Sequence, residues 1–350
     1  VSPGLVDAHT HAAWVGSRHD EYAARMAGAG YEQIAARGGG IRASMRAVRA
    51  ASLAELAAEL QARLARMAEL GVTTVEVKSG YGLDLESEQK QLGAIACAAG
   101  VASLPRVVPT YLALHALPPE AEGDRPAFAR RVAQHDLPEL AREGLFRYVD
   151  AYVDRSAFSV AEARPALEKA RELGAGLRLH VGQFADVGGA ELAAELGAAS
   201  VDHVEHLSEA AARALAEAGT RAVLLPVASY TLGMAPPDLA LLRRVGLRLV
   251  VASDANPGTA PTESLPLAMA LSVRSYGLSV DEAWLGATRE AARSLGLDDV
   301  GTLRRGARAD LVGWDLPHEA AVVMPWGTPR TRFVLRDGRR IAGHTPGARG

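Results

Sequence analysis

Two histidines near the start of the chain, His9 and His11, have types and spacing suited to metal binding. The apolar residues Leu5 and Val6 precede them and predict a β-strand. Alternate side chains of a strand lie on one face, so both imidazoles would project to the same side. Imidazole nitrogens are common ligands of transition metals. The pair is therefore half of a candidate metal site, unless the His-x-His sequence arose by chance or caps the strand end.

Three more polar residues stand where later strands are expected to end, namely His180, His203 and Asp254. A single histidine at a strand end is more often an ordinary polar residue than a ligand. Five such residues at the ends of inner strands instead indicate a shared site. Nitrogen and oxygen ligands without sulfur suit Zn²⁺ or Fe²⁺. We expect one divalent metal per subunit, with four ligands: His9, His11, His180 and Asp254.

Such a metal site predicts a hydrolytic reaction. A divalent metal can lower the pKa of bound water from 15.7 to about 7, which supplies a nucleophile at neutral pH. Asp254 could accept the proton of that nucleophile, and His203 could hydrogen-bond the developing oxyanion. The expected chemistry is metal-assisted hydrolysis of a C–N or C–O bond.

The elements that must position these residues alternate regularly along the chain. Helical periodicity begins with the capping box of Ser52 and Glu55, and strand and helix patterns then follow one another. This alternation predicts a parallel sheet, and eight strands predict an α/β fold of the TIM-like (β/α)8 barrel type, with its active site at the carboxyl ends of the strands. The predicted strands are residues 5–6, 73–77, 106–111, 148–153, 177–181, 200–204, 221–226 and 247–252.

Two other parts of the chain depart from this alternation. Residues 20–49 are polar and rich in glycine, which predicts a long loop with one short helix, of the kind that often covers a site. A flexible surface loop would have the same composition. After the last predicted strand, helices are predicted over residues 263–276 and 280–295.

Beyond residue 300 the pattern changes to short strands. They are predicted at 301–303 and 309–314, with a hairpin over 331–339 that turns at Asp337-Gly338. We expect a barrel domain over residues 1–300 and part of a small β-sandwich domain over 301–350. Because so few strands leave open edges and the sequence starts without Met, we expect N-terminal strands of the small domain to be missing.

Composition narrows the class of protein. The 350 residues carry a net charge of −3 with both signs interspersed, so we expect no nucleic-acid partner and no anionic membrane surface as a partner. Cys97 is the only cysteine, which excludes an internal disulfide and a thiolate-only metal site. No apolar stretch approaches the roughly 20 residues that span a bilayer. With no signal-peptide pattern, a cytoplasmic location is expected.

Residues 3–11, with the three later strand-end residues, resemble the amidohydrolase superfamily. Within it, the chain is similar over nearly its whole length to the imidazolonepropionase family. The more specific segments are residues 38–41, 75–83 and 253–258. The resemblance implies ring-opening hydrolysis of 4-imidazolone-5-propanoate to N-formimidoyl-L-glutamate in histidine degradation. It also implies a homodimer, for which the sequence itself gives no pattern.

The resemblance further implies a set of substrate contacts. Arg18 would bind the propionate carboxylate through its planar guanidinium. The other implied substrate-binding residues are Tyr31, Tyr81, His115, Gln183, Asn256, Gly258 and Thr259. Without the resemblance, Arg18 would be read as a solvated surface residue, Tyr81 as barrel-mouth packing and His115 as an ordinary loop residue.

Two positions depart from the pattern of related enzymes. Gln183 stands three residues after His180, where relatives can carry Glu; a glutamine can orient a ring but cannot shuttle protons. Gln183 therefore joins His203 and Asp254 as a catalytic candidate with an orienting role only. Binuclear superfamily members use a carbamylated lysine on strand four, but residues 148–153 contain no lysine. We therefore expect a single metal, with Lys78 on strand two either structural or supporting the metal ligands from behind.

Two alternatives to this function stay open. One is another cyclic amidohydrolase, or a purine or pyrimidine aminohydrolase, which would not need Arg18 to bind a carboxylate. The other is a catalytically silent barrel used for assembly. Such proteins commonly lose metal ligands, whereas this chain retains all four candidates.

Overall fold

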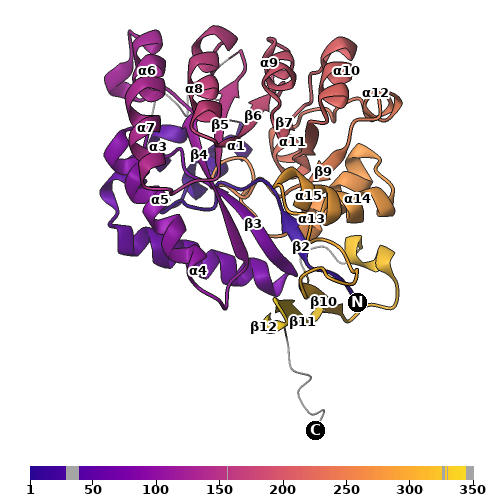
Figure 1. Ribbon diagram of the computed structural model, residues 1–350. Helices are drawn as coiled ribbons and strands as arrows, with labels where there is room; N and C mark the ends of the chain where they lie inside the picture. Colours follow the sequence, from indigo (N-terminus) through magenta and orange to yellow (C-terminus); the bar gives the residue numbers. More distant parts are fainter. Residues whose placement is uncertain (29–38, 156, 325–327, 329, 344–350) are drawn as a thin grey trace.

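The computed structural model describes residues 1–28, 39–155, 157–324, 328 and 330–343. Eight parallel strands form one sheet in which each strand pairs with the next in sequence order. An isolated parallel bridge between Thr10 and Ala255 joins the first of these strands to the last, just beyond their carboxyl ends. The predicted α/β barrel is confirmed (Figure 1). Its strands are β2 (Leu5–Asp7), β3 (Val72–Lys78), β4 (Arg106–Leu114), β5 (Tyr148–Val153), β6 (Gly176–Val181), β7 (Ser200–His203), β8 (Arg221–Leu224) and β9 (Leu249–Val251).

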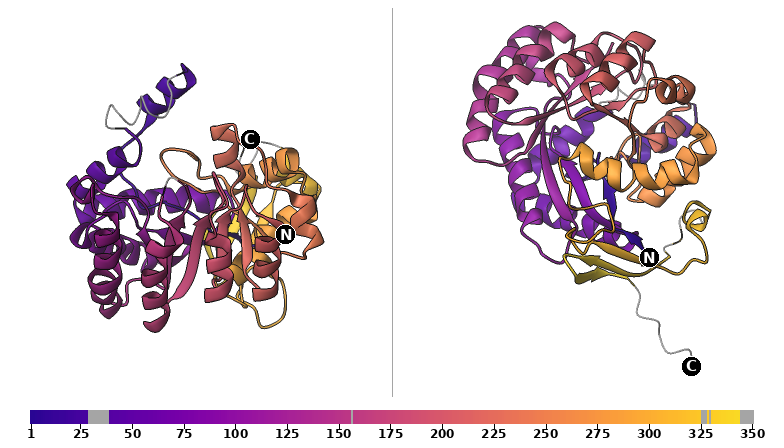
Figure 2. Two further views of the ribbon diagram at one scale, coloured as in Figure 1. Left: turned by 90° about the horizontal axis from the view of Figure 1, so that it is seen from above. Right: turned by 45° about the vertical axis from the view of Figure 1, so that its right-hand side comes forward.

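Helices surround this barrel, as the turned view in Figure 2 shows. Capping boxes begin three of them, at Ser52, Ser159 and Ser279, where a serine and a glutamate three residues later satisfy each other's backbone N–H groups. The α-helices are α1 (His19–Met26), α3 (Ile41–Ala50), α4 (Leu53–Glu69), α5 (Leu85–Ala99), α6 (Arg125–Arg131), α7 (Leu137–Arg142), α8 (Val160–Glu172), α9 (Gly189–Leu196), α10 (Glu209–Ala218), α11 (Pro226–Leu232), α12 (Leu239–Arg244), α13 (Leu265–Leu271), α14 (Val280–Gly286) and α15 (Arg289–Ser294). Short 3₁₀ or π segments are η1 (Pro119–Ala121), η2 (Val132–Asp136), η3 (Ser272–Tyr276) and η4 (Glu319–Val323).

Some predicted helices and strands are corrected. The described residues of the insertion contain two helices, α1 and α3, where one was predicted; α1 buries no residue and so lacks the apolar periodicity that reveals a helix. Pro226 begins α11 instead of ending a strand, because proline suits the first turn of a helix. The predicted helix over 280–295 is divided into α14 and α15 at Thr288, whose φ of −134° and ψ of −93° are not helical.

A separate antiparallel sheet lies beside the barrel, with the order β1 (Ser2–Pro3), β10 (Leu311–Trp314), β11 (Thr331–Arg336), β12 (Arg339–Ala342). The Asp-Gly hairpin is confirmed, and both turn residues have the positive φ that a tight hairpin requires, 51° at Asp337 and 75° at Gly338. The predicted strand at 301–303 is wrong. Gly301 has a φ of 68°, and a Cβ there would lie 2.5 Å from the carbonyl oxygen of Thr288, so the chain passes helix α15 too closely for a regular strand. The division of the chain into two domains at residue 300 stays a prediction.

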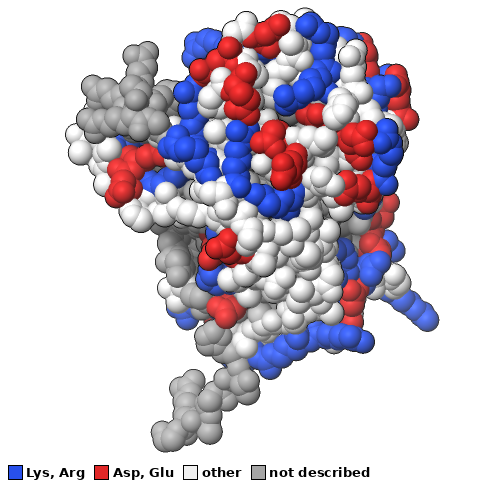
Figure 3. All heavy atoms as spheres, turned by 90° about the vertical axis from the view of Figure 1, so that its left-hand side faces the viewer, with Lys and Arg blue, Asp and Glu red and all other residues white. Residues whose placement is uncertain are grey.

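The distribution of charge on the surface and the apolar character of the helices test the expectations about partners. On the face shown in Figure 3, lysine and arginine side chains are interspersed with aspartate and glutamate. Within the part of the chain that the structure describes, no helix combines the length and the apolar character that a membrane span requires.

Candidate active site

Four polar side chains converge where the barrel closes. His9 and His11 follow β2, His180 lies near the end of β6, and Asp254 follows β9. Oδ1 of Asp254 lies 3.5 Å from Nε2 of His9 and 3.5 Å from Nε2 of His11. Nε2 of His180 lies 3.3 Å from Nε2 of His11. All four are buried, so the sequence prediction that they share one place agrees with the geometry.

The chemistry of this donor set fits a divalent metal. Ligand atoms about 2.0–2.1 Å from a tetrahedral ion are about 3.3–3.4 Å apart, close to the separations found among these nitrogens and this oxygen. Among the described residues, Nε2 of His9 is buried without a hydrogen-bond partner. Burial lowers the pKa of both His9 and His11 well below the usual value, and Lys78 contributes to this shift. Neutral imidazoles are the form that ligates metals.

A fully buried group of charged residues, which we call the ionic layer, lies behind these ligands; its members are Glu76, Lys78, Asp150, Arg178 and Asp202. Asp202 Oδ2 lies 2.9 Å from Nδ1 of His9, and Asp150 Oδ1 lies 3.1 Å from Nδ1 of His180. A carboxylate on Nδ1 holds the proton there and turns the lone pair of Nε2 toward the site. The ionic layer thus fixes the tautomers of two proposed ligands.

Lys78 occupies the centre of the ionic layer. Its Nζ donates to Glu76 and to Asp150, both at 2.7 Å, and lies 3.7 Å from Asp202. Burial opposes the ammonium charge, but the neighbouring carboxylates keep the pKa of Lys78 above its usual value. Likewise, burial opposes ionisation of Asp150, yet His180 and Lys78 lower its pKa. Asp150, His180 and Asp202 also have ligand atoms within 4.8 Å of one another, and the Lys78 ammonium lies beside both carboxylates.

His203 stands beside the ligands at the end of β7. Its ring centroid lies 5.5 Å from that of His180 and 6.1 Å from that of His9. Burial, and secondarily His180, lowers the pKa of His203 to about 3. Gln183 is also buried, and its Oε1 accepts a 2.6 Å hydrogen bond from the hydroxyl of Tyr152, whose ring stacks toward that of His203. A role for Gln183 in orientation is therefore consistent with its contacts.

The loop after β9 is organised by Asn256. Its Nδ2 donates to the carbonyl of Asp254 at 2.7 Å, and its Oδ1 accepts from the backbone N–H groups of Gly258 and Thr259 at 2.8 and 2.7 Å. Asp254 itself has a φ of 55°, which is uncommon for a residue with a side chain. Burial raises the pKa of the Asp254 carboxyl well above its usual value. The Asn256 amide is thus used within the loop rather than left free.

The outer edge of the site, which we call the rim, contains Arg18, Gly258 and Thr259. The Arg18 side chain is 13% exposed, and its Nη2 donates to Glu21 at 2.8 Å. A Cβ on Gly258 would lie 2.3 Å from Nη1 of Arg18, so glycine permits this close approach. The predicted surface reading of Arg18 is therefore not supported, and its guanidinium reaches the loop that follows Asp254.

Aromatic side chains form one wall of the candidate site. The ring of His115 stacks on that of His11 with centroids 5.2 Å apart, and its Nδ1 lies 2.8 Å from the carbonyl oxygen of Gly80. Burial lowers the pKa of His115 to about 4. Tyr81 is buried, 6.0 Å from His11 between centroids. The remaining predicted contact, Tyr31, lies outside the described residues.

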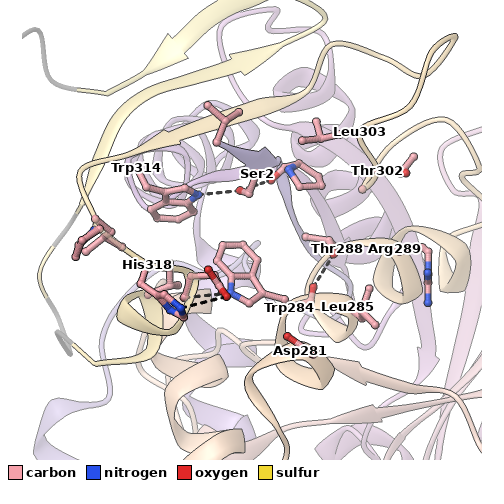
Figure 4. A pocket seen from close by; sticks show the side chains of 17 residues that line it. Ser2, Asp281, Trp284, Leu285, Thr288, Arg289, Thr302, Leu303, Trp314 and His318 are labelled. Atoms are coloured by element: carbon pink, nitrogen blue, oxygen red, sulfur yellow. Dashed lines mark hydrogen bonds and ion pairs between the residues drawn. The ribbon is translucent and has the colours of Figure 1, made fainter.

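A hollow of about 660 Å³ elsewhere on the molecule does not contain the site (Figure 4). It lies between the small sheet and helices α14 and α15, and its wall includes Ser2, Trp284, Trp314 and His318. None of the predicted site residues that the structure describes lines it. This hollow is therefore separate from the site at the barrel mouth.

Comparison with known proteins agrees with this geometry. The model of the amidohydrolase family matches residues 1–342. The chain belongs to the amidohydrolase family. It is 46% identical over 329 residues to the imidazolonepropionase of Mesorhizobium japonicum, covering 93% of this chain and 80% of the relative. It is 47% identical over 339 residues to the imidazolonepropionase of Acidiphilium cryptum, covering 96% and 84%.

Solved structures of the same fold are more distant in sequence. N-isopropylammelide isopropylaminohydrolase from Burkholderia multivorans matches with a TM-score of 0.71 and 20% identity, covering 98% of this chain and 86% of that chain. A variant of atrazine chlorohydrolase from Arthrobacter aurescens matches with a TM-score of 0.69 and 16% identity, covering 98% and 83%. At these identities the likeness concerns the fold.

The sequence missed several residues that the geometry brings to the site. Asp150 and Asp202 lie inside predicted strands, and the sequence gave no sign of their partners. Glu205, two residues after His203, is also close to the site. Each could have been found only as a charged residue in an otherwise apolar strand or strand end.

Proposed function

We propose that this amidohydrolase is an imidazolonepropionase, which opens the ring of 4-imidazolone-5-propanoate to give N-formimidoyl-L-glutamate. The observation that carries the proposal is the convergence of His9, His11, His180 and Asp254 in a chain 46–47% identical to proteins named imidazolonepropionase. Amidohydrolases are metal-dependent, and the cluster of histidines suits that requirement.

The reaction adds one water across the ring amide. The oxygen of water bonds to the ring carbonyl carbon, the bond from that carbon to the ring nitrogen breaks, and the nitrogen gains a proton. When bound, one divalent metal, Zn²⁺ or Fe²⁺, would polarise the carbonyl and activate the water. We assign Asp254 as the group that takes a proton from the water and returns it to the leaving nitrogen.

Other residues bind and orient in this scheme. His203 donates to the oxygen on which negative charge develops, and Gln183 orients the groups beside it. Arg18 binds the propionate carboxylate with the donors that Glu21 leaves free: Glu21 holds Nε and Nη2, and Nη1 lies against Gly258. The wall residues Tyr81 and His115 and the loop residues Asn256, Gly258 and Thr259 would surround the ring. Tyr31 stays a predicted contact.

The test is an assay of the purified protein with 4-imidazolone-5-propanoate, coupled to quantification of bound metal. We expect turnover with about one metal per chain, and loss of turnover on chelation that the metal restores. A metal-loaded, folded protein that leaves the substrate intact contradicts the proposal. Turnover of a purine, pyrimidine or other cyclic amide instead would identify the alternative within the family. Homodimerisation and a cytoplasmic location stay predictions.

A further inference from the structure

Beside His203 lies a buried hydrogen-bonded cluster that the scheme above does not use. It consists of Glu205 in the loop after β7, Ser229 on α11, and Tyr276 at the end of η3. The Ser229 hydroxyl donates to Glu205 Oε1 at 2.5 Å, and the Tyr276 hydroxyl donates to Ser229 Oγ at 2.6 Å. Tyr276 also lies 3.4 Å from Glu205 Oε1. Three separate segments therefore fix one oxygen of the Glu205 carboxyl.

The other oxygen of that carboxyl faces His203. Glu205 Oε2 lies 4.0 Å from Nδ1 of His203, and the two side chains are only 2% and 5% exposed. Among the described residues, neither of these two atoms has a hydrogen-bond partner. Leaving a buried polar group unpaired is unfavourable, whereas a small rotation of either side chain would join this pair. Catalytic hydrogen bonds are often long before substrate binds.

The backbone between the two side chains is strained. His203 has a φ of 85° and Val204 a φ of 66°. Positive φ is a genuine outlier for a β-branched residue such as valine, and the surrounding structure must hold such a residue in place. The turn is anchored to the end of β6, because Val204 donates to Val181 at 3.1 Å and His206 donates to Gly182 at 2.7 Å. The fold thus maintains a costly turn that places the imidazole and the carboxyl side by side.

We propose that Glu205 is a positioning residue for His203: held by Ser229 and Tyr276, its carboxyl donates a proton to Nδ1, unlike the carboxylates of the ionic layer, and so keeps the ring hydrogen on Nε2. The proton count is the same for a neutral carboxyl beside a neutral imidazole and for a carboxylate beside an imidazolium. In both forms Nε2 carries the hydrogen that donates to the developing oxyanion. This inference rests on the proposed function, in which His203 is that donor.

The variant Glu205→Leu tests it, because leucine cannot bond to Nδ1. We expect kcat with 4-imidazolone-5-propanoate to fall about 10–100-fold, the range typical of partners that orient a reacting group, while KM changes less than about threefold. In a His203→Asn background, the same substitution should lower kcat less than about twofold, since residues that act as a unit are not additive. Metal content should not change.

Glu205→Gln provides rescue by a conservative variant that retains a donor for Nδ1. We expect it to keep kcat within about threefold, and two-bond ¹H–¹⁵N spectra to show hydrogen on Nε2 of His203 in the unmodified protein and in this variant, but not in Glu205→Leu. Glu290→Gln is the control, because Glu290 on α15 is also a buried carboxylate; its Oε2 accepts no hydrogen bond from the described residues and lies 3.6 Å from Nε of Arg221. It should leave kcat unchanged.

Two results would overturn the positioning role. One is an equal loss of kcat from Glu205→Leu with and without His203, which indicates a structural part only. The other is a His203 tautomer that is the same in all three proteins. If the unmodified protein does not hydrolyse the substrate, the proposed function fails, and the spectra alone then decide whether Glu205 sets the tautomer of His203.

Discussion

The ionic layer and the rim of the site are built in different ways. Every side chain of the ionic layer is fully buried, lies on a barrel strand and has at least two charged or histidine partners. The rim combines Arg18, which precedes the exposed helix α1, with a loop that Asn256 holds in shape. The difference indicates that the groups behind the proposed ligands are fixed from several directions, whereas Arg18, assigned to recognition, is held mainly by Glu21.

The largest effect should come from the proposed ligands. Asp254→Ala or His180→Ala should abolish turnover and remove most of the bound metal, because each supplies one of four donors. Circular dichroism should show that most helix content remains. His135→Ala, which changes an exposed histidine on η2, is the control and should keep both activity and metal. Full activity in either ligand variant would remove that residue from the site.

The next largest effect should come from the ionic layer. Asp202→Asn weakens the partner of His9 and leaves the buried cations Lys78 and Arg178 undercompensated. We expect activity or metal affinity to fall about 10–100-fold and the free energy of unfolding to fall by about 3–5 kcal/mol. Metal titration and urea unfolding measure the two effects. The control is Asp136 on η2, which is also a buried aspartate but lies outside the ionic layer. Asp136→Asn should therefore affect stability without affecting metal affinity.

A pH-dependent effect should follow from Glu205. Burial raises its pKa from 4.5 to about 7. Between these values the native state holds a proton that the unfolded state releases, so this contribution to stability is present below pH 4.5 and is lost as the pH rises toward 7. The free energy of unfolding of Glu205→Gln, relative to the unmodified protein, should therefore rise by roughly 3 kcal/mol over that window, at 1.36 kcal/mol per pKa unit. A constant difference would contradict the shift.

The smallest effect should come from the rim. Arg18→Ala should raise KM about tenfold with little change in kcat, since the lost hydrogen bonds to a carboxylate are worth about 1.5–3 kcal/mol and the rim is partly open to water. Arg25→Ala is the comparison, because Arg25 is a near neighbour whose Nη1 lies 3.5 Å from the carbonyl oxygen of Gly258. A KM unchanged by Arg18→Ala would favour a substrate without a carboxylate. A large fall in kcat would place Arg18 with the chemistry and remove the contrast.

The sequence predicted the barrel and the proposed ligands because both depend on local patterns. Strand five was predicted over 177–181 and is found as Gly176–Val181, and its histidine was placed correctly at the carboxyl end. Parallel strands bring such ends together whatever their spacing in the chain. The same reasoning applied to His203 and Asp254, which lie with the other candidates in the barrel mouth.

Partnerships between distant charges could not be predicted. Lys78 was correctly expected on strand two, but its contacts with Asp150 depend on strand register and side-chain direction, which no local pattern contains. The exposed helix α1 was also missed as a separate element, because a helix that buries nothing leaves no apolar stripe. β1 was not predicted for another reason: its two residues form a strand only because they pair with Leu311 and Val312.

The closure of the barrel has a consequence for how the protein reaches its working form. The seam between the first and last barrel strands is held by the bridge of Thr10 to Ala255 and by Ser253 with Asp7, which are 246 positions apart in sequence. The proposed ligands His9, His11 and Asp254 flank this seam on both sides. A folding intermediate in which these two strands are not yet joined therefore lacks the complete set of proposed metal ligands. An ion bound there would hold the two ends of the barrel together, and its removal should loosen those ends first.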